Sequence, residues 1–145
     1  ELIQSSIDRL AGYQSALTQA NLTSAADFVQ DGGFSIAGGF VAMQRLLALE
    51  DQPDAVFCAN DEMAIGALKA INDAGLKVPS DIGLVGFNDS EICQYTTPSL
   101  TTIHKPIEQM AKLGGERLFQ LINNMQLTNP VTELVAELVI RDSVR

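Results

Sequence analysis

The chain has 145 residues, with 9 Lys and Arg against 18 Asp and Glu, so its formal net charge is −9. That length suits one ordinary domain with a real hydrophobic core. Hydrophobic residues make up 46% and charged residues 19%, which is too apolar for intrinsic disorder. Seven acids lie between Asp27 and Glu62, where Arg45 is the only base. The chain therefore lacks the clustered bases that nucleic-acid binding through its own surface would need.

The two cysteines, Cys58 and Cys93, have neither CxxC nor Cys/His spacing. This pattern is typical of reduced structural thiols in a cytoplasmic protein, and a disulfide between them is the less favoured alternative. No apolar stretch approaches the length of a membrane span, and residues 1–5 do not resemble a signal peptide.

Apolar periodicity predicts helices and strands in alternation along the first part of the chain. The expected helices cover residues 5–20, a segment capped by Ser35 and a segment from about 61 that Gly75 closes; the expected strands cover 25–29, 55–59 and 82–87. This alternation is the pattern of an α/β fold with a doubly wound parallel sheet.

Beyond Pro98 the pattern changes. Residues 100–103 read as extended, a long helix is expected from Pro106 to Asn123, and residues 132–140 form a last strand. The chain opens on a helix, whereas a doubly wound domain normally opens on a strand. We therefore expect a parent protein truncated at its N-terminus, with the first strand missing.

Three loops leave successive predicted strands at the edge where open α/β sheets bind ligands: Gly32-Gly33-Phe34-Ser35, Asn60-Asp61 and Asn88-Asp89. Amide and carboxylate groups pair with vicinal hydroxyls, and a Phe face packs on the apolar face of a ring. This edge predicts a site for a neutral polyhydroxylated or heterocyclic small molecule. Taken singly, each residue also has a structural interpretation, as a helix cap or a turn former.

Catalytic, phosphate and metal sites are poorly supported. Residues 33–37 resemble a nucleophile elbow without its final glycine, and His104 follows in Ser…Asp…His order, so a hydrolase is a distant third hypothesis. No lysine follows Gly38 as a phosphate loop requires. One His and two distant Cys do not make a metal site. We expect no catalytic residue, metal or cofactor.

Several ordered segments carry a resemblance to a known family. Residues Ala59-Asn60-Asp61-Glu62-Met63-Ala64-Ile65-Gly66-Ala67 resemble a hallmark of the LacI/GalR family of bacterial transcription regulators. Further matches are Arg9-Leu10-Ala11-Gly12-Tyr13, Gly75-Leu76-Lys77-Val78-Pro79-Ser80-Asp81-Ile82, Val85-Gly86-Phe87-Asn88-Asp89 and Pro98-Ser99-Leu100-Thr101-Thr102-Ile103. Together they cover nearly the whole chain, and their order makes the resemblance specific.

The resemblance implies the carboxyl-terminal part of a two-lobed, periplasmic-binding-protein-like (type I) effector core. Residues 1–102 would form the C-terminal lobe without its first strand, 103–130 would visit the N-terminal lobe, and 131–145 would be the return strand and tail. The helix-turn-helix head that binds operator DNA, and most of the first lobe, would be absent. The acidic balance is then that of a sensor without its basic head.

The resemblance also assigns an effector site. Arg9 matches an arginine that hydrogen-bonds the effector, Phe34 an aromatic residue that packs on it, and Asn60 a polar group that leaves the strand. Asn88 stands where members usually have Asp, and Ile107 matches a cleft-lining position; Ser5 completes the set. Purine-responsive members carry a second arginine six residues before the first, where this chain has Ile3, which argues against a purine base.

A homodimer interface is implied by the same resemblance, through helix 61–74, residues 35–41 and the loop 92–96. Its expected members are Ser35, Ile36, Met63, Cys93 and Tyr95. For Met63 and Ile65 a plain core position is at least as good an interpretation. Closure of the two lobes would bias operator affinity through this dimer.

The sequence thus predicts the effector-sensing domain of a cytoplasmic LacI-type repressor that binds a sugar or nucleoside and has no catalytic activity. The alternative is a periplasmic sugar-binding protein of an ABC-type uptake system, which shares the fold. Residues preceding Glu1 would distinguish the two, because a regulator has a helix-turn-helix there and a transporter component a signal peptide.

Overall fold

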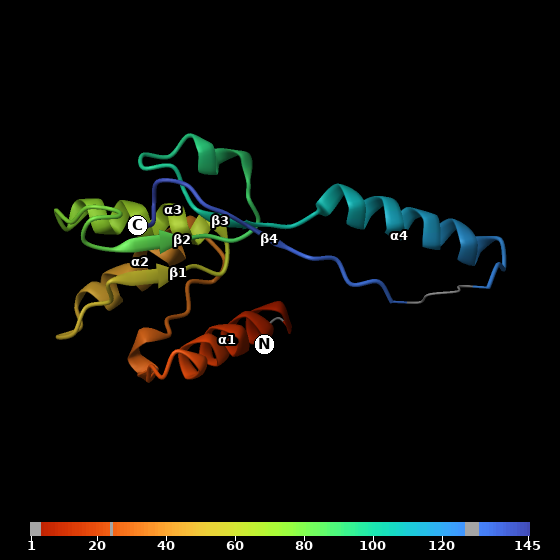
Figure 1. Ribbon diagram of the computed structural model, residues 1–145. Coiled ribbons are helices and arrows are strands. Elements are labelled where there is room, and N and C mark those ends of the chain that lie inside the picture. The colour runs from red at the N-terminus through yellow and green to blue at the C-terminus, as the bar shows by residue number, and fades with distance from the viewer. Residues whose placement is uncertain (1–3, 24, 127–130) are drawn as a thin grey trace.

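The computed structural model of the chain describes residues 4–23, 25–126 and 131–145 (Figure 1). In chain order its elements are α1 (Gln4–Gln19), the 3₁₀ helix η1 (Ala26–Phe28), α2 (Ile36–Leu47), β1 (Ala55–Phe57), α3 (Asp61–Asp73), β2 (Gly83–Val85), the 3₁₀ helix η2 (Glu91–Gln94), β3 (Thr102–His104), α4 (Ile107–Ile122) and β4 (Glu137–Val139).

Parallel strands form the centre of the fold, as the sequence predicted. β1 and β2 pair in parallel with Ala55 opposite Gly83. The next segment continues the sheet, because Val85 and Thr101 form a parallel bridge and the Gly86 N–H donates to the Thr101 carbonyl at 2.9 Å. β3 then pairs antiparallel with β4, with Ile103 opposite Leu138. The α/β class is confirmed, with an antiparallel pair where the chain leaves and returns.

Helices α2 and α3 pack closely because glycines stand where their backbones meet. A Cβ on Gly66 would collide with the Ile36 carbonyl oxygen, and one on Gly39 would collide with the backbone of Met63. This contact is part of one hydrophobic core under the strands, whose members include Met43, Leu46, Ala64, Ala67, Ile71, Leu84 and Leu100. The core thus holds rigid the end of the sheet from which the predicted site loops emerge.

The predicted helix ends are confirmed at three points. The Ser35 hydroxyl accepts the Gly38 N–H at 3.0 Å and caps α2. The Asn60 side chain caps α3, and Gly75 follows that helix with a φ of 78°, in the left-handed region that glycine adopts freely.

The strand expected over 25–29 is wrong. Residues 26–28 form a single 3₁₀ turn and Val29 is extended without a ladder partner among the described residues. Spacing alone does not tell a short apolar run in a strand from one in a turn. The other strands are confirmed but are shorter than expected. Only residues that lie opposite a neighbouring strand form ladder hydrogen bonds.

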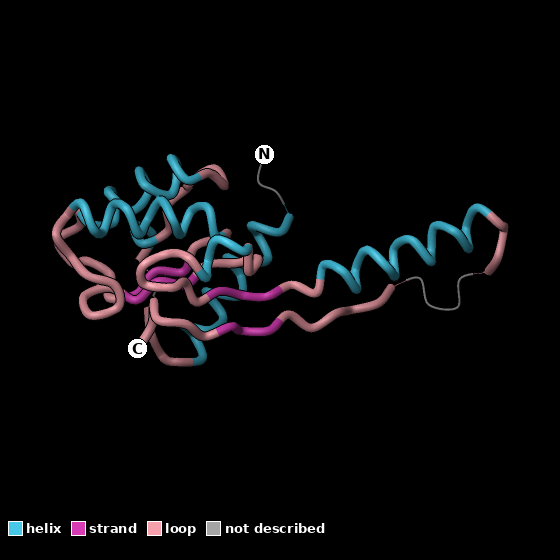
Figure 2. Tube along the Cα trace, turned by 90° about the horizontal axis from the view of Figure 1, so that it is seen from above, coloured by secondary structure: helices cyan, strands magenta, loops and turns pink. Residues whose placement is uncertain are grey.

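Two helices contribute nothing buried to this core. Neither α1 nor α4 has a buried residue, and α4 projects away from the other elements (Figure 1). Seen from above, β3 and β4 run side by side toward α4 (Figure 2). Large apolar side chains stay exposed there, among them Phe119 at 66% and Val135 at 83%. Among the described residues, no helix combines the length and the apolar character that crossing a membrane requires.

Candidate functional site

Arg9 and Phe87 meet at the end of β2. The guanidinium carbon of Arg9, on α1, lies 4.1 Å from the centroid of the Phe87 ring. The ammonium of Lys105, which follows β3, lies 5.7 Å from the same centroid. Phe57 meets the Phe87 ring edge-on, at 6.4 Å between centroids. Phe87 therefore gathers two cations from segments far apart in the sequence.

The partial burial of Arg9 has an electrostatic consequence. Removal from water lowers the pKa of its guanidinium, and the neighbouring Asp8 carboxylate only partly offsets this. The group stays charged at physiological pH, because an arginine gives up its proton only in strongly basic solution. A partly desolvated cation at a strand end is suited to bind an oxygen-rich ligand.

A hollow of about 530 Å³ opens beside Phe87. Its lining includes Asn88, Lys105 and Ile107, together with His104 and Glu108. The backbone N–H of Asn88 donates to the Ile103 carbonyl at 2.9 Å. The Asn88 side-chain amide makes no hydrogen bond within the described part of the chain. Of the residues predicted to bind the effector, Arg9, Asn88 and Ile107 are therefore grouped around Phe87 and Lys105.

Asn60 has the structural role that was weighed against binding. Its side-chain oxygen accepts the Met63 N–H at 2.8 Å, and its amide nitrogen donates to the Phe34 carbonyl at 3.1 Å. Phe34 itself has a φ of 53°, so this bond holds a strained loop in place. Asn60 thus positions Phe34, and a direct contact of either residue with an effector stays a prediction. Ser5 is half-buried one turn before Arg9, and its role also stays a prediction.

Asp61 is a buried carboxylate behind the site. It accepts the Ser90 hydroxyl at 2.6 Å, the Ser90 N–H at 2.8 Å and the Thr102 hydroxyl at 2.5 Å. Burial alone would raise its pKa, but the hydrogen bonds from Ser90 and Thr102 outweigh burial, and the pKa is lowered. A Cβ on Gly86 would collide with this carboxylate. Asp61 therefore fixes the loop after β2 to the start of β3.

The sequence did not predict the ion pair between Asp89 and Arg141. The Asp89 carboxylate accepts Arg141 Nη2 at 2.7 Å and contacts His104 Nδ1 at 3.0 Å. Arg141 also donates to the Leu100 carbonyl at 2.8 Å. No local motif signals a pair so far apart along the chain. The same holds for the approach of Lys105 to Phe87, which only the folded chain brings together.

The predicted dimer-interface residues divide into exposed and buried ones. Ile36 and Tyr95 are exposed, at 50% and 71%. Met63 is partly buried and packs against the core, and the Ser35 hydroxyl is occupied as a helix cap. Cys93 is 0% exposed. It is the buried residue of η2, and its place in the dimer contact stays a prediction.

The arrangement does not favour the hydrolase hypothesis. The Ser35 hydroxyl caps α2, His104 pairs with Asp89, and no hydrogen bond joins Ser35 to His104 within the described ranges. Nor do those ranges contain a cluster of three or more His, Cys, Asp or Glu side chains placed to hold a metal ion.

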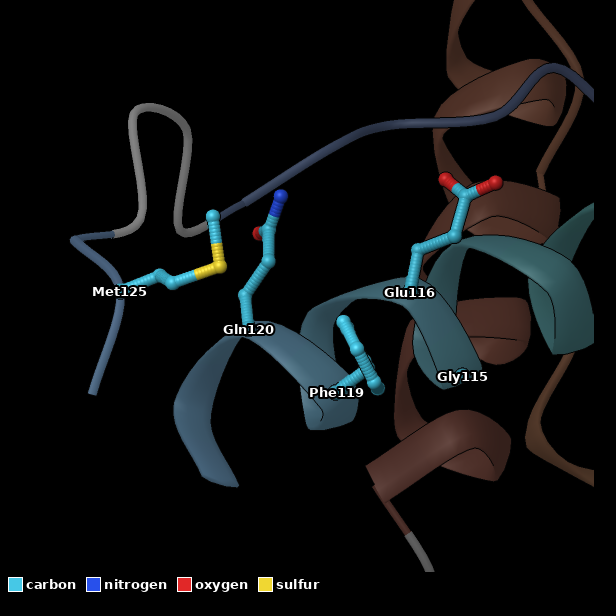
Figure 3. A pocket seen from close by; sticks show the side chains of 5 residues that line it. All are labelled: Gly115, Glu116, Phe119, Gln120 and Met125. Atoms are coloured by element: carbon cyan, nitrogen blue, oxygen red, sulfur yellow. The ribbon is translucent and has the colours of Figure 1, made fainter. Parts of the chain in front are cut away.

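A second hollow, of about 480 Å³, lies on the projecting helix. Figure 3 shows its lining residues Gly115, Glu116, Phe119, Gln120 and Met125, which come from α4 and the turn after it. None of the predicted site residues lies there. Two parts of the prediction lie outside the described residues: Ile3, expected to disfavour a purine base, and residues 127–130, at the end of the predicted N-lobe segment.

Comparison with known proteins places this geometry in a family. The periplasmic-binding-protein-like domain matches residues 3–144. The probable HTH-type transcriptional repressor ExuR of Bacillus subtilis is 43% identical over 145 residues, which is 100% of this chain and 44% of that protein. The HTH-type transcriptional repressor PurR of Vibrio campbellii is 38% identical over 138 residues, 95% of this chain and 41% of that protein.

Solved structures agree. The lac repressor dimer bound to operator and the anti-inducer ONPF gives a TM-score of 0.88 at 34% identity, covering 97% of this chain and 48% of that one. The complex of the transcriptional regulator CelR with cellobiose gives 0.87 at 33% identity, covering 94% and 42%. The chain spans less than half the length of each of these four proteins. It belongs to the periplasmic-binding-protein-like domain family, in the form found in LacI-type transcriptional regulators.

Proposed function

We propose that this chain is the effector-sensing part of a LacI-type transcriptional repressor. The observation that carries the proposal is that Arg9 lies over the Phe87 ring, which Lys105 also approaches from a hollow lined by Asn88 and Ile107. Ligands of open α/β sheets bind at this edge. The similarity to the repressors ExuR and PurR supports the same function.

The division of the chain between two lobes is part of the proposal. Residues 1–102 form the C-terminal lobe, 103–130 pass into the N-terminal lobe, and 131–145 return. The exposed apolar side chains of α4 and of the segment before β4 support this division, because a second lobe packed on them would bury them. The effector would then bind between the lobes, with the hollow beside Phe87 as one wall.

We further propose a homodimer that binds operator DNA through a head outside these residues. The similarity to the lac repressor, whose solved structure is a dimer bound to its operator, supports this arrangement. The exposed Ile36 and Tyr95 are the described members of the predicted contact. Such a regulator acts in the cytoplasm and catalyses no reaction. The alternative, a periplasmic sugar-binding protein, has no comparable support among the relatives.

Operator release in the complete natural protein tests the proposal. Arg9→Ala should abolish the effector-dependent change in operator affinity, measured by fluorescence anisotropy, and leave effector-free operator binding intact. Arg45→Ala is the matched control, since Arg45 lies on the exposed side of α2. A normal effector response in Arg9→Ala would contradict the assignment.

A further inference from the structure

Two cations converge on one ring at the proposed effector site. Arg9 and Lys105 lie 4.1 and 5.7 Å from the Phe87 centroid, so they are no further apart than those two distances combined. Neither side chain makes an ion pair or a hydrogen bond to another described residue. Both side chains are half-buried. Like charges held together away from bulk water are unfavourable unless an anion joins them.

The acids near the hollow do not neutralise this pair. Asp89 is engaged by Arg141 at 2.7 Å, and it contacts His104 at 3.0 Å. Glu108 lies at the rim on an exposed position. Asp8, beside Arg9 on α1, acts on the Arg9 guanidinium electrostatically but forms no ion pair with it. No described carboxylate is therefore ion-paired to Arg9 or Lys105, in a chain whose overall charge is −9. Two cations without an ion-pair partner among the described residues thus lie at the strand ends of an acidic molecule, where they would attract an anion.

Two further groups suit the same ligand. The Asn88 side-chain amide has no hydrogen-bond partner among the described residues, so it can form a hydrogen bond with a ligand hydroxyl. Because the amide is neutral, it adds no negative charge to the site. α4 begins at this hollow, and its first residue, Ile107, lines it. The N-cap residue of that helix, Pro106, offers no side-chain cap, and the positive helix end adds to the field of the two cations. An acidic group and a hydroxyl would each find a matching partner here.

We propose that the effector is an anionic sugar, with a carboxylate or phosphate held between Arg9 and Lys105 and a hydroxyl held by Asn88. This inference rests on the proposed sensor function and narrows it. The sequence predicts a neutral ligand, because it does not show that Lys105 lies beside Phe87. The folded chain places this second cation at the site.

Thermal shift and calorimetry on the complete natural protein test the inference. The probes are D-glucose and D-galactose, their uronates, their 6-phosphates, and adenosine, with sodium acetate and inorganic phosphate at equal ionic strength. We expect an acidic sugar to raise the melting temperature and its neutral parent to do so far less. Stabilisation by the uronates or by the 6-phosphates identifies the acidic group as carboxylate or phosphate.

Lys105→Met separates this inference from the proposed function. Loss of one charge-assisted contact should weaken binding of the acidic sugar about 10- to 100-fold and narrow its advantage over the neutral parent. Lys105→Arg should retain most of the affinity. Lys77→Met removes a lysine from the loop after α3 and should bind as the natural protein does.

The remaining outcomes each decide a separate point. Equal stabilisation by a neutral sugar or by adenosine, unchanged in Lys105→Met, overturns the anionic assignment and leaves the sensor function standing. Equal stabilisation by acetate or inorganic phosphate overturns the sugar. No stabilisation by any probe counts against the sensor function itself, and the inference falls with it.

Discussion

Arg141 and Asp89 form an ion pair of 2.7 Å although 52 positions separate them in the chain. The pair fastens the segment that returns after β4 to the loop that follows β2. Both side chains are largely buried, with 14% and 16% of their surface exposed.

Arg141→Met should destabilise the protein by about 3 kcal/mol, because it leaves the largely buried Asp89 carboxylate with His104 as its one side-chain partner in the described part of the chain. Urea denaturation at pH 7 measures the loss. Arg141→Lys should lose less stability than Arg141→Met, since it keeps the positive charge beside Asp89. Some loss should remain, because lysine cannot also replace the hydrogen bond to the Leu100 carbonyl. A change below about 0.5 kcal/mol in Arg141→Met, the range of ordinary surface substitutions, would show that the pair does not fasten the return.

Gly66→Ala should separate α2 from α3. The added methyl group would meet the backbone carbonyl of Ile36, which cannot turn away as a side chain could. We expect a loss of about 1–3 kcal/mol or more, seen as a lower urea midpoint. Gly12→Ala is the control, because nothing lies within 4 Å of that position on α1 and alanine favours a helix. An equal response of the two variants would refute the close approach.

Asp61→Asn should reduce the stability of the protein at neutral pH. It should also weaken the loss of stability that occurs as the pH falls. The folded pKa of Asp61 lies below its unfolded value, so its contribution is complete above the unfolded pKa, about 4, and is lost as pH falls through the folded pKa. The amide also cannot accept from Ser90 and Thr102 with both atoms. Urea midpoints at pH 7, 5 and 3 should show the variant furthest below the natural protein at pH 7 and closest at pH 3.

Asp73→Asn is the control for that series, since Asp73 is exposed and, among the described residues, pairs only with Lys69 on the same helix. It should follow the natural protein within about 0.5 kcal/mol at every pH. A constant difference between Asp61→Asn and the natural protein from pH 7 to 3 would mean that the carboxylate charge is not what stabilises the loop.

Cys58 and Cys93 should resist iodoacetamide at pH 8 in the folded protein. Both are free and buried, and burial raises the pKa of Cys58 to about 12 and that of Cys93 to about 11. After denaturation without reductant both should be labelled, as peptide mass spectrometry would record. Thiols that stay blocked after denaturation would indicate the disulfide alternative.

The order of helices and strands was predictable because it rests on local rules. Ser35 and Asn60 have the short polar side chains that cap helices, and Gly75 occupies a φ that other residues avoid. The strand over 25–29 was mispredicted because a strand is defined by its neighbour, and no described segment pairs with Val29. Local spacing carries no information about such a partner.

The candidate site was predictable only in part, for a similar reason. Arg9, Asn88 and Ile107 could be named from the family resemblance and are grouped in space. Phe87 and Lys105 gain their role from an approach between α1, β2 and the segment after β3, which no spacing encodes. Asn60 could be named as well, but its two bonds, to Met63 and Phe34, assign it first to the loop.

The 16-residue helix α4 starts at the rim of the hollow and extends from it without a buried residue. A helix of that length spans roughly 24 Å, so a tilt of roughly 10° at its first turn would carry its far end by roughly 4 Å. Ile107 and the residues around it therefore lie at the point about which such a tilt of α4 would turn. A sub-ångström displacement of the first turn would be amplified to several ångströms at the far end of α4.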